Sequence, residues 1–68
     1  MRQVFSSRVD EIGHDPETGE LFVKWKNHGK VSVYSGVDAE KAKTVMNSYS
    51  IGQTLNDLVI GQHDHAYR

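Results

Sequence analysis

Cysteine is absent from this chain of 68 residues, and proline occurs only once. Without cysteine the chain can form neither a disulfide nor a thiolate zinc site. Long hydrophobic runs are also missing, because no apolar stretch approaches the roughly 20 residues of a membrane-spanning helix. The first residues, MRQVFSSRVDE, are too polar for the core of a signal peptide. These absences predict a cytoplasmic protein that makes no contact with a membrane.

An excess of charge of either sign is lacking as well. The 8 basic and 9 acidic residues leave a formal net charge of -1, which predicts no strong non-specific attraction to nucleic acid. Hydrophobic residues make up 37% of the chain, as in a folded domain rather than a disordered segment. A chain this short buries only about 60% of the surface that its unfolded form exposes. We therefore expect a single domain of marginal stability, for which self-association is one source of extra stability.

Three segments in the first half of the chain predict β-strands. Residues 4–12 carry β-forming side chains with imperfect alternation, which indicates a first strand with a bulge. In residues 21–26, LFVKWK, alternation places Leu21, Val23 and Trp25 on one face. Glycine-containing turns, HDPETGE and NHGK, separate the three segments. The segments therefore predict a three-stranded antiparallel meander.

The third strand, VSVY at residues 31–34, alternates in the same way. Its two valines, Val31 and Val33, are predicted to face the core, with Ser32 and Tyr34 on the opposite face. Two roles are open for Tyr34. The first, which we favour, is a ring packed at the end of the strand; the second is an exposed ring that stacks on a ligand.

Two short helices are predicted in the second half of the chain. Asp38 is a good N-cap for a helix whose apolar side chains recur at helical spacing. Ser50 is a second N-cap, and Gln53 three residues later completes a capping box. The apolar stripes of the two helices consist of Ala39, Ala42, Val45, Met46 and Tyr49, and then of Leu55, Leu58 and Val59. The apolar face of the sheet needs a cover, which these stripes can supply.

The predicted fold class is therefore α+β. A three-stranded antiparallel meander is followed by one or two short helices packed on one face, in the order β-β-β-α-α. Residues 1–62 make up this single domain. Residues 63–68, HDHAYR, predict a polar and mobile C-terminal tail.

The sequence does not predict an enzyme. A catalytic site needs a nucleophile beside a base, paired carboxylates or metal ligands in one pocket, and the chain shows no clear set of this kind. His63 and His65 have the alternate spacing of metal ligands on a strand, but they lie in the predicted tail with only Asp64 beside them. We therefore predict no catalytic residue, no metal site and no cofactor.

The residues most suggestive of binding lie on the second and third predicted strands. Lysines neutralise phosphates and aromatic rings stack on bases, so a sheet that presents both can bind single-stranded RNA or a nucleotide. The candidate ligand-binding residues are Lys24, Lys26, Lys30, Tyr34, Trp25 and His28. The alternative, an ordinary sheet face that contacts solvent or another subunit, stays open.

The start of the second predicted helix offers a weaker candidate site, for an anion. Ser50, Gly52 and Gln53 would present free backbone N–H groups and a hydroxyl, which can hold a phosphate at a helix N-terminus. A helix that caps itself with Ser50 and Gln53 is the favoured interpretation, because the capping box already uses these groups.

Several residues in a fixed order carry a family resemblance. They are Ser7, Val9, Ile12, Gly13, Asp15, Trp25, Asn27, Gly29, Tyr34, Gly36, Val37, Ser50, Gly52 and Asn56. This order resembles the KTSC domain, a module named for its place at the C-terminus of some lysyl-tRNA synthetases and found alone in bacteria and phages. His14 and Ser32 stand where the family pattern has aromatic residues. The resemblance runs from Ser7 to about His63; it implies an α+β fold and, from the synthetase context, RNA binding.

Two classes of function follow from these observations. The first is a small non-catalytic binding module for RNA or a nucleotide. The alternative is a protein-interaction or self-assembling module, since a small chain with an exposed sheet edge favours pairing. Examples of the alternative are a phage-encoded inhibitor of a host factor and an oligomer that sequesters a small nucleotide ligand.

Overall fold

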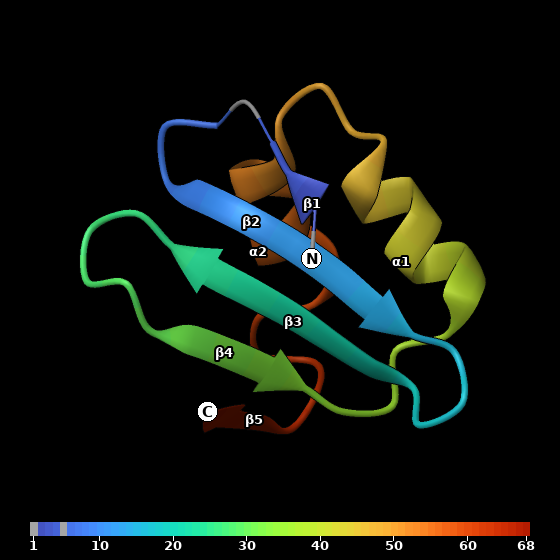
Figure 1. Ribbon diagram of the computed structural model, residues 1–68. Coiled ribbons are helices and arrows are strands. Elements are labelled where there is room, and N and C mark those ends of the chain that lie inside the picture. The colour runs from blue at the N-terminus through green and yellow to red at the C-terminus, as the bar shows by residue number, and fades with distance from the viewer. Residues whose placement is uncertain (1, 5) are drawn as a thin grey trace.

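The computed structural model describes residues 2–4 and 6–68, and for residues 2 and 3 it describes the backbone only. The elements are β1 (Arg2–Gln3), β2 (Val9–Asp15), β3 (Glu20–Trp25), β4 (Val31–Tyr34), α1 (Ala39–Met46), α2 (Ile51–Leu58) and β5 (His65–Tyr67). Within the described residues, five strands form one antiparallel sheet in the order β1-β2-β3-β4-β5. Helix α2 lies behind this sheet and α1 lies beside its β1–β2 edge (Figure 1). The predicted α+β fold, a meander followed by two helices, is confirmed.

The first predicted strand is displaced along the chain. It was expected over residues 4–12, but β2 begins at Val9 and runs to Asp15. Ser6 explains the late start, because its hydroxyl accepts hydrogen bonds from the backbone N–H groups of Arg8 (3.2 Å) and Val9 (3.3 Å) and so forms a turn. The predicted bulge is confirmed by a shift of register between Val9 and Glu11. Phe5, which was part of the predicted strand, lies outside the described residues.

The prediction of a mobile C-terminal tail is wrong. Residues 65–67 form β5, which pairs with β4 at the edge of the sheet. The ladder extends beyond both ends of the strand, since the Ser35 N–H donates to the Asp64 carbonyl (3.0 Å) and the Arg68 N–H to the Val31 carbonyl (2.8 Å). A polar segment this short has no hydrophobic pattern of its own, so only its pairing with β4 defines it as a strand.

The two faces of β4 are the reverse of those predicted. Leu21 pairs with Tyr34 and Val23 pairs with Ser32, and residues paired across a ladder share a face of the sheet. Ser32 and Tyr34 are therefore buried under the helices, whereas the two valines of β4 lie partly exposed on the outer face. Register decides the face of a strand, and a slip of one residue inverts it.

The core lies between the sheet and the helices. It consists of Val9, Ile12, Leu21, Val23, Tyr34, Val37, Ala42, Val45, Ile51, Leu55 and Val59. Of the predicted stripe of α1, Ala42 and Val45 belong to this core and Met46 packs against it while partly buried, whereas Ala39 and Tyr49 do neither. Ala39 is exposed in the first turn, and Tyr49 is fully exposed because α1 ends at Met46. The packing of Leu21 and Val23 predicted for the second strand is confirmed, and Trp25 packs against the same core while remaining partly exposed.

The two helix starts provide a matched test of capping. Asp38 caps α1 as predicted, since its Oδ1 accepts from the Lys41 N–H at 2.7 Å. The predicted capping box at α2 is wrong: the Ser50 side chain makes no capping hydrogen bond.

We expect Asp38→Ala to lower the free energy of unfolding by about 0.5–2 kcal/mol and Ser50→Ala to change it by less than about 0.5 kcal/mol. Urea denaturation measures both, and equal losses in the two variants would contradict this assignment.

Candidate ligand-binding site

A cavity of about 430 Å³ lies where β2 begins and β3 ends. Its lining residues are Ser7, Arg8, Trp25, Lys26, Asn27 and His28. The two chain segments that form it are joined by the Lys26 N–H, which donates to the Arg8 carbonyl at 2.9 Å. The volume lies within the range of about 300–1,000 Å³ that is typical of small-molecule sites. We call this space the Trp25 cavity.

The Trp25 ring is held in a fixed orientation. Its Nε1–H donates to the hydroxyl of the buried Ser32 at 2.6 Å. The rest of the indole packs against the core but remains partly exposed. An aromatic face that is ordered and partly open to solvent is suited to stacking on a planar ligand.

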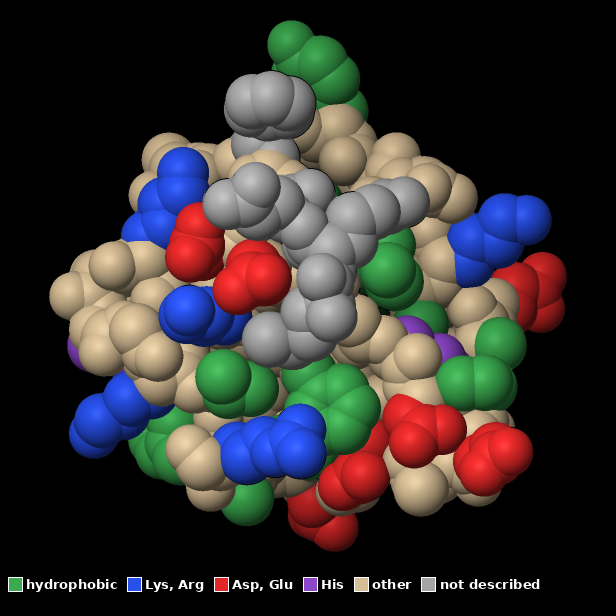
Figure 2. Space-filling view, in the orientation of Figure 1, with side chains coloured by type: hydrophobic (Ala, Val, Ile, Leu, Met, Phe, Trp, Pro, Cys, Tyr) green, Lys and Arg blue, Asp and Glu red, His purple; other side chains and the backbone are tan. Residues whose placement is uncertain are grey.

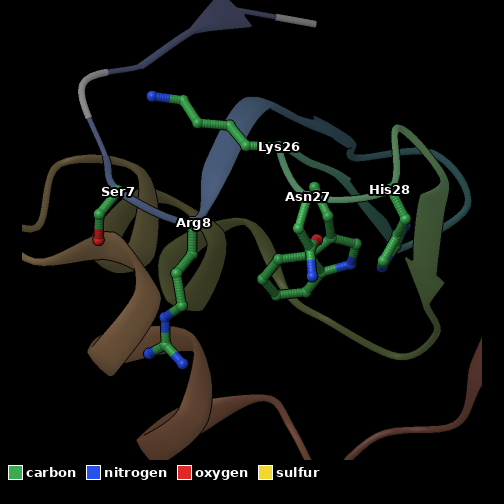
Figure 3. A pocket seen from close by; sticks show the side chains of 6 residues that line it. Ser7, Arg8, Lys26, Asn27 and His28 are labelled. Carbon is green, nitrogen blue, oxygen red and sulfur yellow. The ribbon is translucent and has the colours of Figure 1, made fainter.

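His28 stands on the loop that closes the other side of the cavity. Its Nδ1 accepts from the Lys30 N–H at 3.1 Å, and its ring meets the edge of the Tyr67 ring at a centroid distance of 6.1 Å. In Figure 3, Asn27 and His28 extend from this loop on the side of the cavity opposite Arg8. The loop therefore supplies an imidazole and an amide, both of which can form hydrogen bonds with a ligand.

Arg8 contributes a cationic group on the side facing α2. Figure 3 shows its guanidinium directed from the start of β2 toward a helix. The helix is α2, because a Cβ built on Gly52 would lie 3.1 Å from the Arg8 Nε. The absence of a side chain at Gly52 thus makes room for the guanidinium beside the first turn of α2.

A second hollow of about 280 Å³ adjoins the first and shares Ser7 and Arg8 with it. The three residues predicted as an anion site, Ser50, Gly52 and Gln53, all line this second hollow. Its further lining residues are Ser6, Tyr49 and Ile51. Arg8 therefore stands between the Trp25 cavity and the predicted anion site.

The six predicted ligand-binding residues divide into two groups. Trp25, Lys26 and His28 line the Trp25 cavity, although Figure 3 shows the Lys26 ammonium extending away from His28. Lys24 lies on the outer face of the sheet, where its Nζ is 3.6 Å from a carboxylate oxygen of Glu11. Lys30 lies over the Tyr67 ring, 5.4 Å from its centroid. These two lysines and the buried Tyr34 do not line the cavity.

Tyr34 is a packing residue, as favoured from the sequence. Only 4% of its surface is exposed, and its ring lies 5.0 Å from the ring of His65. Burial raises the pKa of its phenol above the ordinary value of 10.0, while the Ser32 hydroxyl opposes that rise. The predicted position of Tyr34 beside the exposed lysines is therefore wrong, because it rested on the inverted faces of β4.

The histidines of the C-terminal segment have separate partners. The His63 ring bridges the Lys41 Nζ (2.9 Å) and the Ser35 carbonyl (3.0 Å), whereas His65 contacts the rings of Tyr34 and Tyr67. In the described part of the chain, no three histidine or acidic side chains come close enough to hold a metal ion.

None of the helices in the described residues has the length and apolar character needed to cross a membrane.

Sequence reasoning missed Arg8, Ser7 and Asn27 as lining residues of this cavity. Asn27 lies between two predicted site residues, so its position was open to prediction. Arg8 and Ser7 come from a distant segment, and only the pairing of β2 with β3, in which Val9 lies opposite Trp25, brings them to the cavity. A correct register for that hairpin is the signal that would have found them.

The fold and the site define a small α+β domain with a ligand-sized cavity at one end of an antiparallel sheet. The model of the KTSC domain family matches residues 5–62, and the chain belongs to this family. Its structure is similar to the crystal structure of a KTSC domain protein from Yersinia pestis, with a TM-score of 0.93 and 25% sequence identity over 98% of this chain and 93% of that chain. A search of curated proteins gave no match.

Five of the fourteen residues that carry the family resemblance line the two hollows. Ser7, Trp25 and Asn27 line the Trp25 cavity, and Ser50 and Gly52 line the second hollow. The two departures from the family pattern have structural partners here. His14 Nε2 lies 2.7 Å from the Val37 carbonyl, and Ser32 binds the Trp25 indole.

Proposed function

We propose that this protein is a non-catalytic binding module that holds a nucleotide unit in the Trp25 cavity. The unit is either a free nucleotide or one nucleotide of single-stranded RNA, since both present the same base, sugar and phosphate. The observation that carries the proposal is the presence of a fixed aromatic ring, Trp25, and two cationic side chains, Arg8 and Lys26, around one cavity. Stacking of bases on aromatic rings and neutralisation of phosphate by cations are the common means of binding single-stranded nucleic acid.

Each lining residue has a role in this proposal. The exposed face of Trp25 stacks on the base. Arg8, which stands between the two hollows, binds the phosphate, and Lys26 adds a second positive charge. Asn27 and His28 form hydrogen bonds with the edge of the base or with the sugar.

The charge distribution favours a single nucleotide unit over a long RNA. On the face shown in Figure 2, the basic side chains that are visible stand apart from one another, with acidic side chains among them. The net charge of -1 points the same way, because extended tracking of a nucleic-acid backbone needs a positively charged groove. A single nucleotide unit that binds within one cavity needs only the two cationic side chains that line it, Arg8 and Lys26.

Binding without chemical conversion is supported by the same residues. In the described part of the chain, Ser7 and His28 are not joined by a hydrogen bond; the His28 Nδ1 accepts instead from the backbone of Lys30. A serine nucleophile needs an adjacent base to activate it. The described residues that line the Trp25 cavity also include no carboxylate that could serve as such a base.

Titration with a labelled short single-stranded RNA at about 50 mM and about 200 mM salt tests the proposal. One neutralised phosphate predicts a slope of log K against log salt of about -0.7, and Arg8→Gln should bring this slope close to zero, with a smaller reduction for Lys26→Gln. The matched control is Lys24→Gln, which removes a lysine from the outer face and should leave the slope unchanged. Absence of binding at the lower salt, or an equal effect of Lys24→Gln, would contradict the proposal.

The same titration with a mononucleotide distinguishes the two forms of the ligand. Competition by the mononucleotide at a concentration similar to that of the RNA would identify a free nucleotide as a sufficient ligand. Competition only at far higher concentration would identify a nucleotide within a chain as the ligand.

A further inference from the structure

The outer edge of β5 is unpaired in the part of the chain that the structure describes. β5 is the last strand in the order of the sheet, and all three of its residues are exposed. Figure 1 shows it at the border of the molecule, next to β4 and with none of the described elements on its other side. Such an edge is a template for pairing with another strand.

The hydrogen bonds of β5 show which backbone groups are available at this edge. Asp64 and Arg68 bond to β4, and Ala66 lies opposite Val33 between those two bonds. In an antiparallel pair, alternate residues point their backbone groups toward and away from the neighbouring strand. His65 and Tyr67 therefore direct their N–H and C=O groups away from β4, toward solvent.

Protection of this edge is weak. Exposed edge strands are commonly protected by short length, charged side chains, proline or a bulge. β5 is only three residues long, but the segment DHAYR at residues 64–68 contains neither lysine nor proline. The charges that it does carry, at Asp64 and Arg68, have opposite signs and lie two residues on either side of Ala66.

We propose that the chain forms a dimer by antiparallel pairing of β5 with β5 of a second copy, centred on Ala66. In this register His65 lies opposite Tyr67 of the second copy, and the available N–H and C=O groups of both strands are paired. Asp64 then lies opposite Arg68 of the second copy, and the twofold axis repeats this ion pair at the other end of the strand. The two subunits share one continuous sheet.

The charges of Asp64 and Arg68 favour a second copy of the chain as the partner of β5 and also determine the register of the pairing. The neighbouring registers place residue 65 opposite residue 65, or residue 67 opposite residue 67, and in these either Asp64 or Arg68 faces Ala66 of the second copy. Only the register centred on Ala66 brings both charged residues together with partners of opposite sign. A second copy supplies this complementary pattern automatically, because a twofold interface uses the same surface on both subunits.

A charge exchange tests the interface by sedimentation equilibrium, up to a protein concentration of about 1 mM so that weak complexes are detected. The wild type should show a reversible monomer–dimer equilibrium. Asp64→Arg and Arg68→Asp should each raise the dimer Kd by about tenfold, because each places like charges opposite one another at both ends of the interface. The double variant Asp64→Arg/Arg68→Asp should recover the Kd of the wild type. A wild type that is monomeric at every concentration, or a double variant no stronger than the single ones, would overturn the proposal.

His65→Pro tests the backbone pairing independently of the charges. Proline removes an N–H that points away from β4, so the β4–β5 ladder keeps its hydrogen bonds while the dimer loses two by symmetry. Circular dichroism checks that the subunit is folded. We expect a folded monomer, and dimerisation as strong as that of the wild type would overturn the proposal. Because this interface does not include Arg8 or Lys26, its failure would leave the nucleotide titration unaffected.

Discussion

Tyr34→Ala is expected to lower the free energy of unfolding by about 3–5 kcal/mol, the usual cost of removing a large buried aromatic ring. The ring is 4% exposed, pairs with Leu21 across the sheet and contacts His65. A domain of 68 residues has a total stability of only roughly 3–10 kcal/mol, on the basis of 0.05–0.15 kcal/mol per residue. The variant should therefore be partly or wholly unfolded at room temperature.

Tyr34→Phe is the matched control for this substitution. It keeps the ring and removes only the hydroxyl, whose interaction with Ser32 is worth about 0.5–1.5 kcal/mol. Urea denaturation followed by circular dichroism compares the two variants. If the free energy of unfolding fell by a small and equal amount in Tyr34→Ala and Tyr34→Phe, the placement of the Tyr34 ring in the core would be contradicted.

The phenol of Tyr34 also predicts a pH dependence. Burial raises its pKa in the folded state above the ordinary value of 10.0, so above pH 10 the unfolded chain loses this proton before the folded one does. Stability from this group is complete below pH 10 and is lost as the pH rises through the folded-state pKa. The difference in unfolding free energy between the wild type and Tyr34→Phe should therefore shift in favour of the variant above pH 10. A difference that stays constant across this range would contradict burial of the phenol.

Trp25→Ala is expected to weaken nucleotide binding by about 1–3 kcal/mol, or roughly 5- to 150-fold, which is the range for loss of one base–aromatic stack. Among the described residues that line the cavity, Trp25 is the only aromatic ring other than the imidazole of His28, so none of them offers a second stacking platform. The labelled RNA titration measures the loss. Circular dichroism is needed beside it, because the indole also packs against the core.

Trp25→Phe separates stacking from the indole N–H. Phenylalanine offers a smaller ring that still stacks, but it loses the hydrogen bond from Nε1 to Ser32 that fixes the orientation of the indole. We expect its affinity to lie between those of the wild type and Trp25→Ala. Binding by Trp25→Ala that equals the wild type would place the ligand elsewhere on the protein.

The sequence predicted β3 well and β4 poorly, for a physical reason. In β3 Leu21 and Val23 share one face, and the other face carries Lys24 beside Phe22, so the face without a charge is the one suited to the core. In β4 two valines alternate with Ser32 and Tyr34, and either set can be buried. The choice depends on the register with β3 and on the hydrogen bond between Ser32 and the Trp25 indole, neither of which is visible in the alternation of one strand.

The candidate site was predictable where its residues are neighbours in the sequence. Trp25, Lys26 and His28 lie within four positions of one another, and the structure places all three at one cavity. Arg8 comes from another strand, and its approach to Gly52 depends on tertiary packing. The short strand β5 was missed for a related reason, since its pairing with β4, rather than a sequence pattern, defines it.

The intrinsic fluorescence of Trp25 is the most direct test of the proposed site, because this residue is the only tryptophan in the chain. A mononucleotide titrated at about 50 mM salt should quench the emission in a saturable manner as its base stacks on the indole. The same titration of Arg8→Gln should need a higher nucleotide concentration for half-saturation, with an unchanged thermal unfolding midpoint. Emission that does not respond to any nucleotide, or a response that is identical in Arg8→Gln, would contradict the assignment of the Trp25 cavity as a nucleotide site.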